Sequence, residues 1–123
     1  MRQLSNLSGT WRGWIITNRN RDSVAFELRF GNASIIGEGI DSGGRFEIDG
    51  QFDAVSSRVV FTKRYANREV LQEARWDGRI LAGRWFFSCL NMSEEGPVAE
   101  AGSGSFELWP AGDEIPLPPI EET

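Results

Sequence analysis

Histidine is absent from the 123 residues of this chain, and cysteine occurs once, as Cys89. The usual ligands of a transition metal are therefore missing, and an intrachain disulfide is excluded. Without a histidine to activate it, Cys89 is interpreted as a small buried hydrophobe rather than a nucleophile. The sequence thus predicts no metal site and no cofactor, and it offers no recognisable catalytic residue.

Long apolar runs are missing as well. No stretch approaches the ~20 residues that a membrane helix requires, and residues 1–9 lack the apolar core of a signal peptide. Acidic residues outnumber basic ones by 18 to 13, a net charge of −5, whereas nucleic acids and anionic membranes are bound by clustered Lys and Arg. We expect a soluble, cytoplasmic protein with neither nucleic acid nor membrane as a partner.

A sustained helical period is also absent, and alternation with a period of two takes its place. Phe46, Ile48, Gly50 and Phe52 alternate with charged and amide side chains, as in a strand with one buried face. The turn before this strand is Asp41-Ser42-Gly43-Gly44, because glycine adopts positive φ freely and Asp bonds back to the backbone. The same signals predict strands over 9–17, 23–30, 35–40, 45–52, 58–65, 70–76, 79–90 and 103–109.

Eight strands are the number at which a meander closes with an interior sized for side chains or one small ligand. The sequence therefore predicts an all-β fold, a single antiparallel up-and-down barrel over residues 1–110. Residues 91–102 are predicted as the longest loop, and residues 111–123 as an extended, Pro-rich acidic tail. Strand 79–90 is apolar on both faces, so the inward set contains either Trp85 or Arg84, and the Trp85 set is preferred.

The two ends of such a barrel differ in chemistry. Turns alternate between the ends, so residues 18–22, 41–44, 66–68 and 91–102 share one rim. Their length and polarity predict the mouth of a ligand site at this rim. The opposite end collects four inward aromatic side chains and is predicted to be a packed floor, made of Trp11, Phe30, Phe52 and Trp76.

Inward positions near the mouth carry the only unusual chemistry. Lys63, Tyr65 and Gln72 lie there, with Trp85, or with Arg84 if strand 79–90 faces the other way. In the structural interpretation, Lys63 extends to the rim or pairs with a carboxylate such as Glu69, because a buried ammonium loses its hydration. In the functional interpretation, these residues orient a small polar or anionic ligand.

Several apolar side chains point outward, notably Trp14, Ile16, Leu71 and Trp109. The last strand, the first strand and strand 79–90 are neighbours in a closed barrel, so much of this set forms one patch. A contiguous apolar patch usually marks a contact surface. We favour a homo-oligomer formed through these residues over coverage by the chain's own tail.

Two short motifs resemble the calycin superfamily and, within it, the avidin and streptavidin-like barrels. Gly9-Thr10-Trp11 is similar to the Gly-x-Trp that opens the first strand there, and 73–79 is similar to the sixth-strand segment with an inward tryptophan. The resemblance implies an eight-stranded meander barrel, a ligand in the open end and frequent oligomerisation. The biotin site is not matched, since strand 9–17 offers Arg12 and Trp14 and the last strand has no aspartate.

Three functions follow from these observations. The first is a non-catalytic barrel that binds a small molecule of unknown identity at its mouth. The second is an acid–base enzyme that uses Lys63 or a rim carboxylate, which the absence of histidine and of any dyad spacing disfavours. The third is a protein-interaction or structural module that has a filled interior and acts through its outer apolar patch. The volume of the interior separates the third from the other two.

Overall fold

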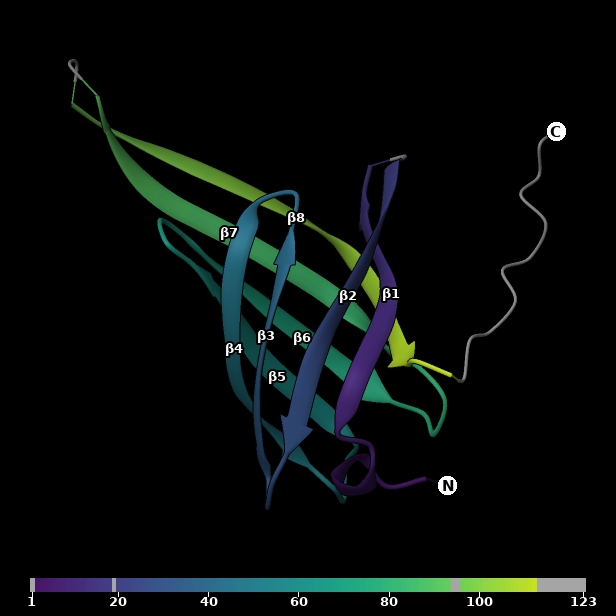
Figure 1. Cartoon of the computed structure of the whole chain (residues 1–123). Coiled ribbons are helices and arrows are strands. Elements are labelled where there is room, and N and C mark those ends of the chain that lie inside the picture. The colour runs from purple at the N-terminus through teal and green to yellow at the C-terminus, as the bar shows by residue number, and fades with distance from the viewer. Residues whose placement is uncertain (1, 19, 94–95, 113–123) are drawn as a thin grey trace, which may run out of the picture.

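Eight antiparallel strands form a closed barrel in the computed structural model (Figure 1). Each strand pairs with the next along the chain, and β8 pairs with β1, so the predicted all-β meander is confirmed. The structure describes residues 2–18, 20–93 and 96–112, with the backbone alone for 88–93 and 96–101. The elements are η1 (Leu4–Asn6), β1 (Gly9–Thr17), β2 (Asn20–Phe30), β3 (Ser34–Asp41), β4 (Gly44–Asp53), β5 (Arg58–Tyr65), β6 (Glu69–Trp76), β7 (Leu81–Ser93) and β8 (Gly96–Pro110).

Alternation decides which side chains fill the barrel. In β4, Phe46 and Ile48 are buried, while Arg45 and Glu47, the residues that precede them, are exposed. The register keeps this alternation in step from strand to strand, since inward Phe46 lies opposite inward Tyr65 on β5. A shift of one residue would turn every inward side chain to solvent, so the buried face fixes the pairing.

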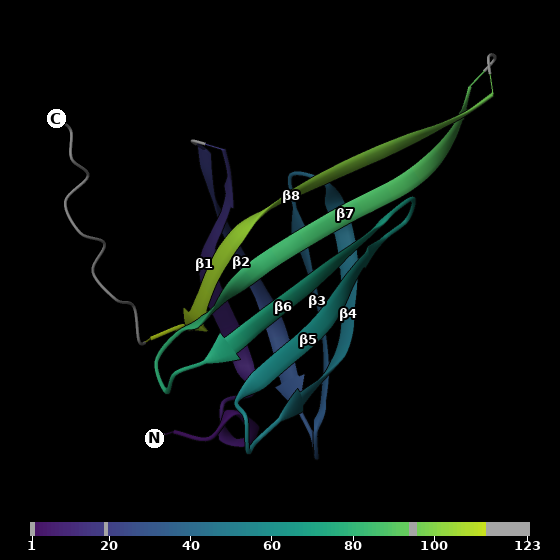
Figure 2. The same cartoon turned by 180° about the vertical axis from the view of Figure 1, so that it is seen from behind.

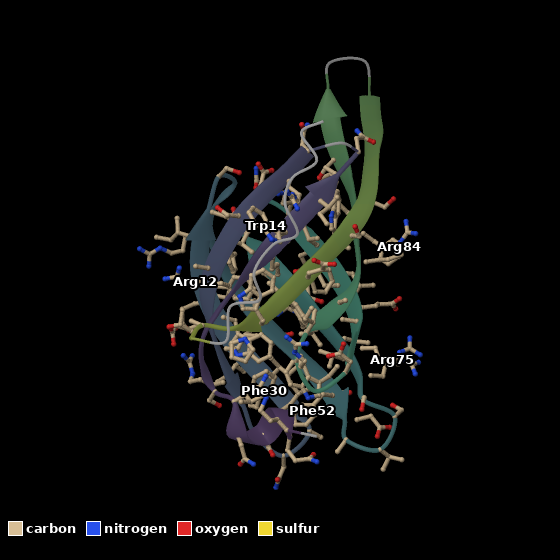
Figure 3. The ribbon with its side chains drawn as sticks, turned by 90° about the vertical axis from the view of Figure 1, so that its right-hand side faces the viewer. Arg12, Trp14, Phe30, Phe52, Arg75 and Arg84 are labelled. Carbon is tan, nitrogen blue, oxygen red and sulfur yellow. The ribbon has the colours of Figure 1, made fainter. Side chains whose placement is uncertain are left out.

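The aromatic floor is present as predicted. The Trp11 ring lies 5.6 Å from that of Trp76 and 5.7 Å from that of Phe30, and Phe30 meets Phe52 edge-on at 5.7 Å. Phe30 and Phe52 lie together at this end in Figure 3. The short helix η1 lies beneath them and buries Leu4 in the core. This end of the barrel is therefore filled with side chains.

The hairpin of β7 and β8 corrects the predicted loop. Residues 91–93 and 96–102 are strand rather than loop, because the ladder continues from Phe87 opposite Gly102 to Ser93 opposite Gly96. Main-chain hydrogen bonds form this ladder whatever the side chains are, so turn-forming residues did not end it. Figures 1 and 2 show the hairpin extending far beyond the other strands. Similarly, β2 begins at Asn20, within the predicted turn 18–22.

Strand β7 turns Trp85 inward and Arg84 outward, which resolves the ambiguity over its two faces. Trp85 packs against the core, whereas Arg84 is exposed and lies over the Phe86 ring. Arg84 and Arg75 point away from the barrel in Figure 3. The Cys89 side chain and residues 113–123, most of the predicted tail, lie outside the described part of the molecule.

Two features are absent from the described residues. No helix among them is long and apolar enough to cross a membrane. Nor do three or more of their Cys, Asp and Glu side chains cluster in a way that would hold a metal ion.

Candidate functional site

A cavity of about 410 Å³ occupies the end of the barrel opposite the aromatic floor. Strands β1, β2, β3, β5, β6 and β7 line it, and the turn residues Ser42, Gly43 and Arg68 border it at the predicted mouth. Its deeper lining combines apolar side chains with a few polar ones. The polar side chains that matter most are Asp41, Lys63, Tyr65 and Gln72.

Lys63 and Tyr65 meet at the carboxylate of Asp41. The Lys63 Nζ donates to Asp41 Oδ2 at 3.4 Å, and the Tyr65 hydroxyl donates to the same oxygen at 2.5 Å. The other oxygen of Asp41 accepts the Gly43 N–H at 2.7 Å. Behind the ammonium lie the Phe46 and Phe26 rings, with centroids 4.5 and 5.4 Å from Nζ. A buried lysine is thus compensated by one carboxylate and two aromatic faces.

The pKa values of this cluster follow from its burial and its hydrogen bonds. Burial lowers the pKa of Lys63, and the Asp41 charge opposes that shift only in part. For Asp41, burial alone would raise the pKa, but the bonds from Tyr65 and Gly43 and the Lys63 charge hold it below its usual value. Burial, together with donation to Asp41, raises the pKa of Tyr65. At neutral pH Asp41 is therefore ionised and Tyr65 protonated.

Gln72 lies deeper in the cavity and has no hydrogen-bond partner. It is 1% exposed, and neither its amide nitrogen nor its amide oxygen is bonded to any described residue. In the ladder it stands between Phe61 of β5 and Trp85 of β7, and it lines the cavity. Buried amides normally have partners, so a bound water or ligand that paired with the Gln72 amide would stabilise this part of the barrel.

Trp85 and Arg68 complete the lining. The Trp85 indole N–H donates to the Ile16 carbonyl at 3.2 Å, which fixes the ring across strand β8. Arg68, in the turn after β5, places its guanidinium 4.6 Å from the centroid of the Tyr65 ring. No carboxylate within the described chain forms an ion pair with Arg68. The mouth therefore carries a positive group that a ligand can reach.

Four of the five predicted site residues share this cavity. Lys63, Tyr65, Gln72 and Trp85 line it, while Arg84 lies on the outer wall and takes no part. Sequence reasoning missed Asp41, which was assigned only to the turn, and named Glu69 instead as an example of a partner for Lys63. Glu69 in fact pairs with Arg64 at 3.2 Å. Because β4 and β5 are neighbours in a meander, the turn between β3 and β4 lies close to Lys63. This adjacency could have identified Asp41 as the partner of Lys63.

The predicted interface residues lie on the outer wall. Trp14 is half-buried beneath the Arg21 guanidinium, 4.8 Å from its ring, and Trp109 is buried. Leu71 is 39% exposed and lies opposite Phe86, which is 38% exposed. Two large apolar side chains are thus adjacent on the surface formed by β6 and β7.

A meander of eight strands closed between β1 and β8, with one end filled and a polar cavity at the other, is an avidin-like fold. Rhizavidin matches with a TM-score of 0.58 and 12% identity over 96% of each chain. The apo form of intact afifavidin matches with a TM-score of 0.55 and 14% identity, over 95% of this chain and 88% of that one. No protein-family model and no curated protein matches the sequence.

Proposed function

We propose that this barrel is a non-catalytic protein that binds a small polar molecule in its mouth cavity. The observation that carries the proposal is a cavity of about 410 Å³ into which buried polar groups project. Lys63 is 3% exposed and Gln72 1% exposed, yet among the described residues the first has one hydrogen-bond partner and the second has none. This volume is within the range of small-molecule sites, about 300–1,000 Å³.

The two other functions are less well supported. A structural module that acts through its outer wall alone has no need of a polar cavity, and its interior would be filled. For an acid–base enzyme, the best catalytic pKa lies near the working pH. The pKa of Asp41 is lowered and that of Tyr65 is raised, so both move away from neutrality. The two similar solved structures share the fold of this chain, and a shared fold by itself does not establish a shared ligand.

Native mass spectrometry of the purified protein tests this proposal. Val70 lines the cavity, whereas Leu71, the next residue, is exposed on the outer wall. We expect the wild type and Leu71→Trp to retain an added small-molecule mass, or to acquire one from a mixture of polar metabolites. Val70→Trp should lose it, because the indole fills the space. Retention by both variants, or by no form of the protein, would contradict the proposal.

A further inference from the structure

The β7–β8 hairpin has two strand edges that pair with no other part of the described chain. Strand β6 pairs with β7 only as far as Phe87, opposite Val70, so residues 88–93 pair with β8 alone. On the other side, β1 pairs with β8 only as far as Ser105, opposite Ile16. The ribbon that extends beyond the rim in Figures 1 and 2 is therefore two strands wide. Such a ribbon is at best marginally stable in water, and a third strand would stabilise it.

The two free edges differ in how well they are protected against pairing. Natural edge strands carry proline, which lacks an N–H, or charged side chains. The free part of β8, residues 96–104, contains Pro97, Glu100 and three glycines. The free part of β7, residues 88–93, reads Ser-Cys-Leu-Asn-Met-Ser and contains no proline, glycine or charged residue. Strand β7 therefore presents the edge that a further strand can join.

A groove on the outer wall adjoins the start of this edge. Leu71, Phe86 and Phe87 supply its apolar lining, together with residues of β5 and β8. Phe87 is the last β7 residue that pairs with β6, so the groove lies where β6 ends and the free edge begins. When a strand adds to a sheet, main-chain hydrogen bonds supply the affinity, and grooves beside the edge accept its side chains. Both components are present here.

The sequence of the free β7 edge suits a second copy of the same segment. Two copies related by a two-fold axis pair antiparallel, and residues on the same face then lie opposite each other. Leu90 of one copy can thus lie opposite Leu90 or Met92 of the other, and no two charged residues are opposed. The chain leaves β8 at the aromatic floor, where Pro110 pairs with Trp11. Residues 113–123 therefore begin at the opposite end of the barrel from this edge.

From these observations we infer that the free edge of β7 pairs antiparallel with the same edge of a second copy. The two hairpins then form one four-stranded sheet, in the order β8–β7–β7–β8, that runs from one barrel to the other. Leu71 and Phe86 of the outer wall lie beside the junction. The inference concerns assembly through main-chain hydrogen bonds, and it does not depend on the proposed ligand.

Hydrogen–deuterium exchange of the wild type, measured at concentrations below and above the onset of association, tests the inference. We expect the amides of residues 88–93 to exchange at least about tenfold more slowly in the oligomer, because pairing protects them. Residues 96–101, whose outer edge stays free, should change little. Exchange of 88–93 that is the same at both concentrations, as an occupant from the same chain would give, overturns the inference. So does protection of 96–101 instead, or a protein that stays monomeric.

Lysine variants locate the contact. Leu90→Lys places two ammonium groups on residues about 5–8 Å apart in the two registers, and like charges at opposed positions destabilise strand pairing. We expect the dissociation constant, measured by analytical ultracentrifugation, to rise about fivefold or more.

Ala99→Lys is the matched control, because Ala99 lies opposite Leu90 on β8. Its two copies would stand about three strand spacings apart, ~14 Å, beyond the screening length of about 8 Å at about 0.15 M salt. The dissociation constant should therefore change less than about twofold. Equal effects of the two variants would contradict the inference. The exchange measurement on the wild type decides the question even if Leu90→Lys fails to fold.

Discussion

At the scale of single residues, the two members of the Lys63–Asp41 pair are not equivalent. The Lys63 side chain is 4% exposed and, within the described part of the chain, donates a hydrogen bond to Asp41 alone, while Asp41 is 15% exposed and also accepts from Tyr65 and Gly43. Loss of the carboxylate leaves the Lys63 ammonium between two phenyl rings without a counterion. Loss of the ammonium leaves a carboxylate that retains two donors near the mouth. Removing the Asp41 carboxylate should therefore lower the free energy of unfolding more than removing the Lys63 ammonium does.

Asp41→Asn should accordingly destabilise the protein far more than Lys63→Met. Breaking a buried pair so that a charge is left without compensation costs about 3–5 kcal/mol, and we expect about 3 kcal/mol for Asp41→Asn against about 1 kcal/mol or less for Lys63→Met. Urea unfolding at pH 7 measures both. Asp49→Asn, which removes an exposed ion pair with Arg64, is the matched control and should cost much less than Asp41→Asn, because exposed ion pairs contribute little to stability. Equal losses for the two cluster variants would refute this asymmetry.

At the scale of elements, adjacent strands approach closely where glycine replaces a side chain. Gly83 on β7 faces Ala74 on β6, and a Cβ at Gly83 would lie against the Glu73 carbonyl oxygen and 2.6 Å from the Ala74 Cα. Both obstacles are backbone atoms, which cannot rotate away as a side chain does. The close approach of β7 to β6 therefore requires glycine here.

Gly83→Ala should destabilise the barrel by about 2 kcal/mol or more, the usual scale of overpacking in a rigid site. The control is Gly31→Ala, where the added methyl would meet only the Ser34 hydroxyl, at 2.9 Å. That oxygen lies on a rotatable side chain, so we expect a clearly smaller loss. Thermal melting followed by circular dichroism compares them. If Gly83→Ala melts at the wild-type temperature, the strands do not approach as closely as described.

At the scale of the whole molecule, the outer wall of β6 and β7 is the best candidate for contact between copies. Leu71 and Phe86 are adjacent and more than one third exposed. Ile36 is more exposed, at 51%, but it stands between Arg29 and Asp49 in the ladder and forms no apolar pair. Exposed apolar side chains that adjoin each other mark contact surfaces more reliably than single ones.

We expect the wild type to sediment as a homo-oligomer and Leu71→Asp to weaken its association by at least about tenfold. A charge in an apolar interface loses hydration without a partner. Analytical ultracentrifugation over a range of concentrations measures the change, and Ile36→Asp should leave the mass unaltered. A wild type that sediments as a monomer at every concentration would end the proposal of self-association.

The amino-acid sequence by itself determined the strands, the closed meander and the aromatic floor. Alternating side chains report which face of a strand is buried, and that information is local. For the same reason it placed Lys63, Tyr65 and Gln72 on inward faces near one rim. It misjudged residues 91–102, since the pairing there depends on two strands at once and the turn-forming residues within each suggested a loop.

Only the tertiary structure decided which groups meet. Asp41 and Lys63 are 22 positions apart, and their contact depends on the register of three strands, which no local pattern encodes. That the Gln72 amide has no partner among the described residues, and that the Trp85 indole bonds to Ile16 across β8, likewise depend on packing around the whole barrel. Local alternation specified the barrel, and long-range register specified its cavity.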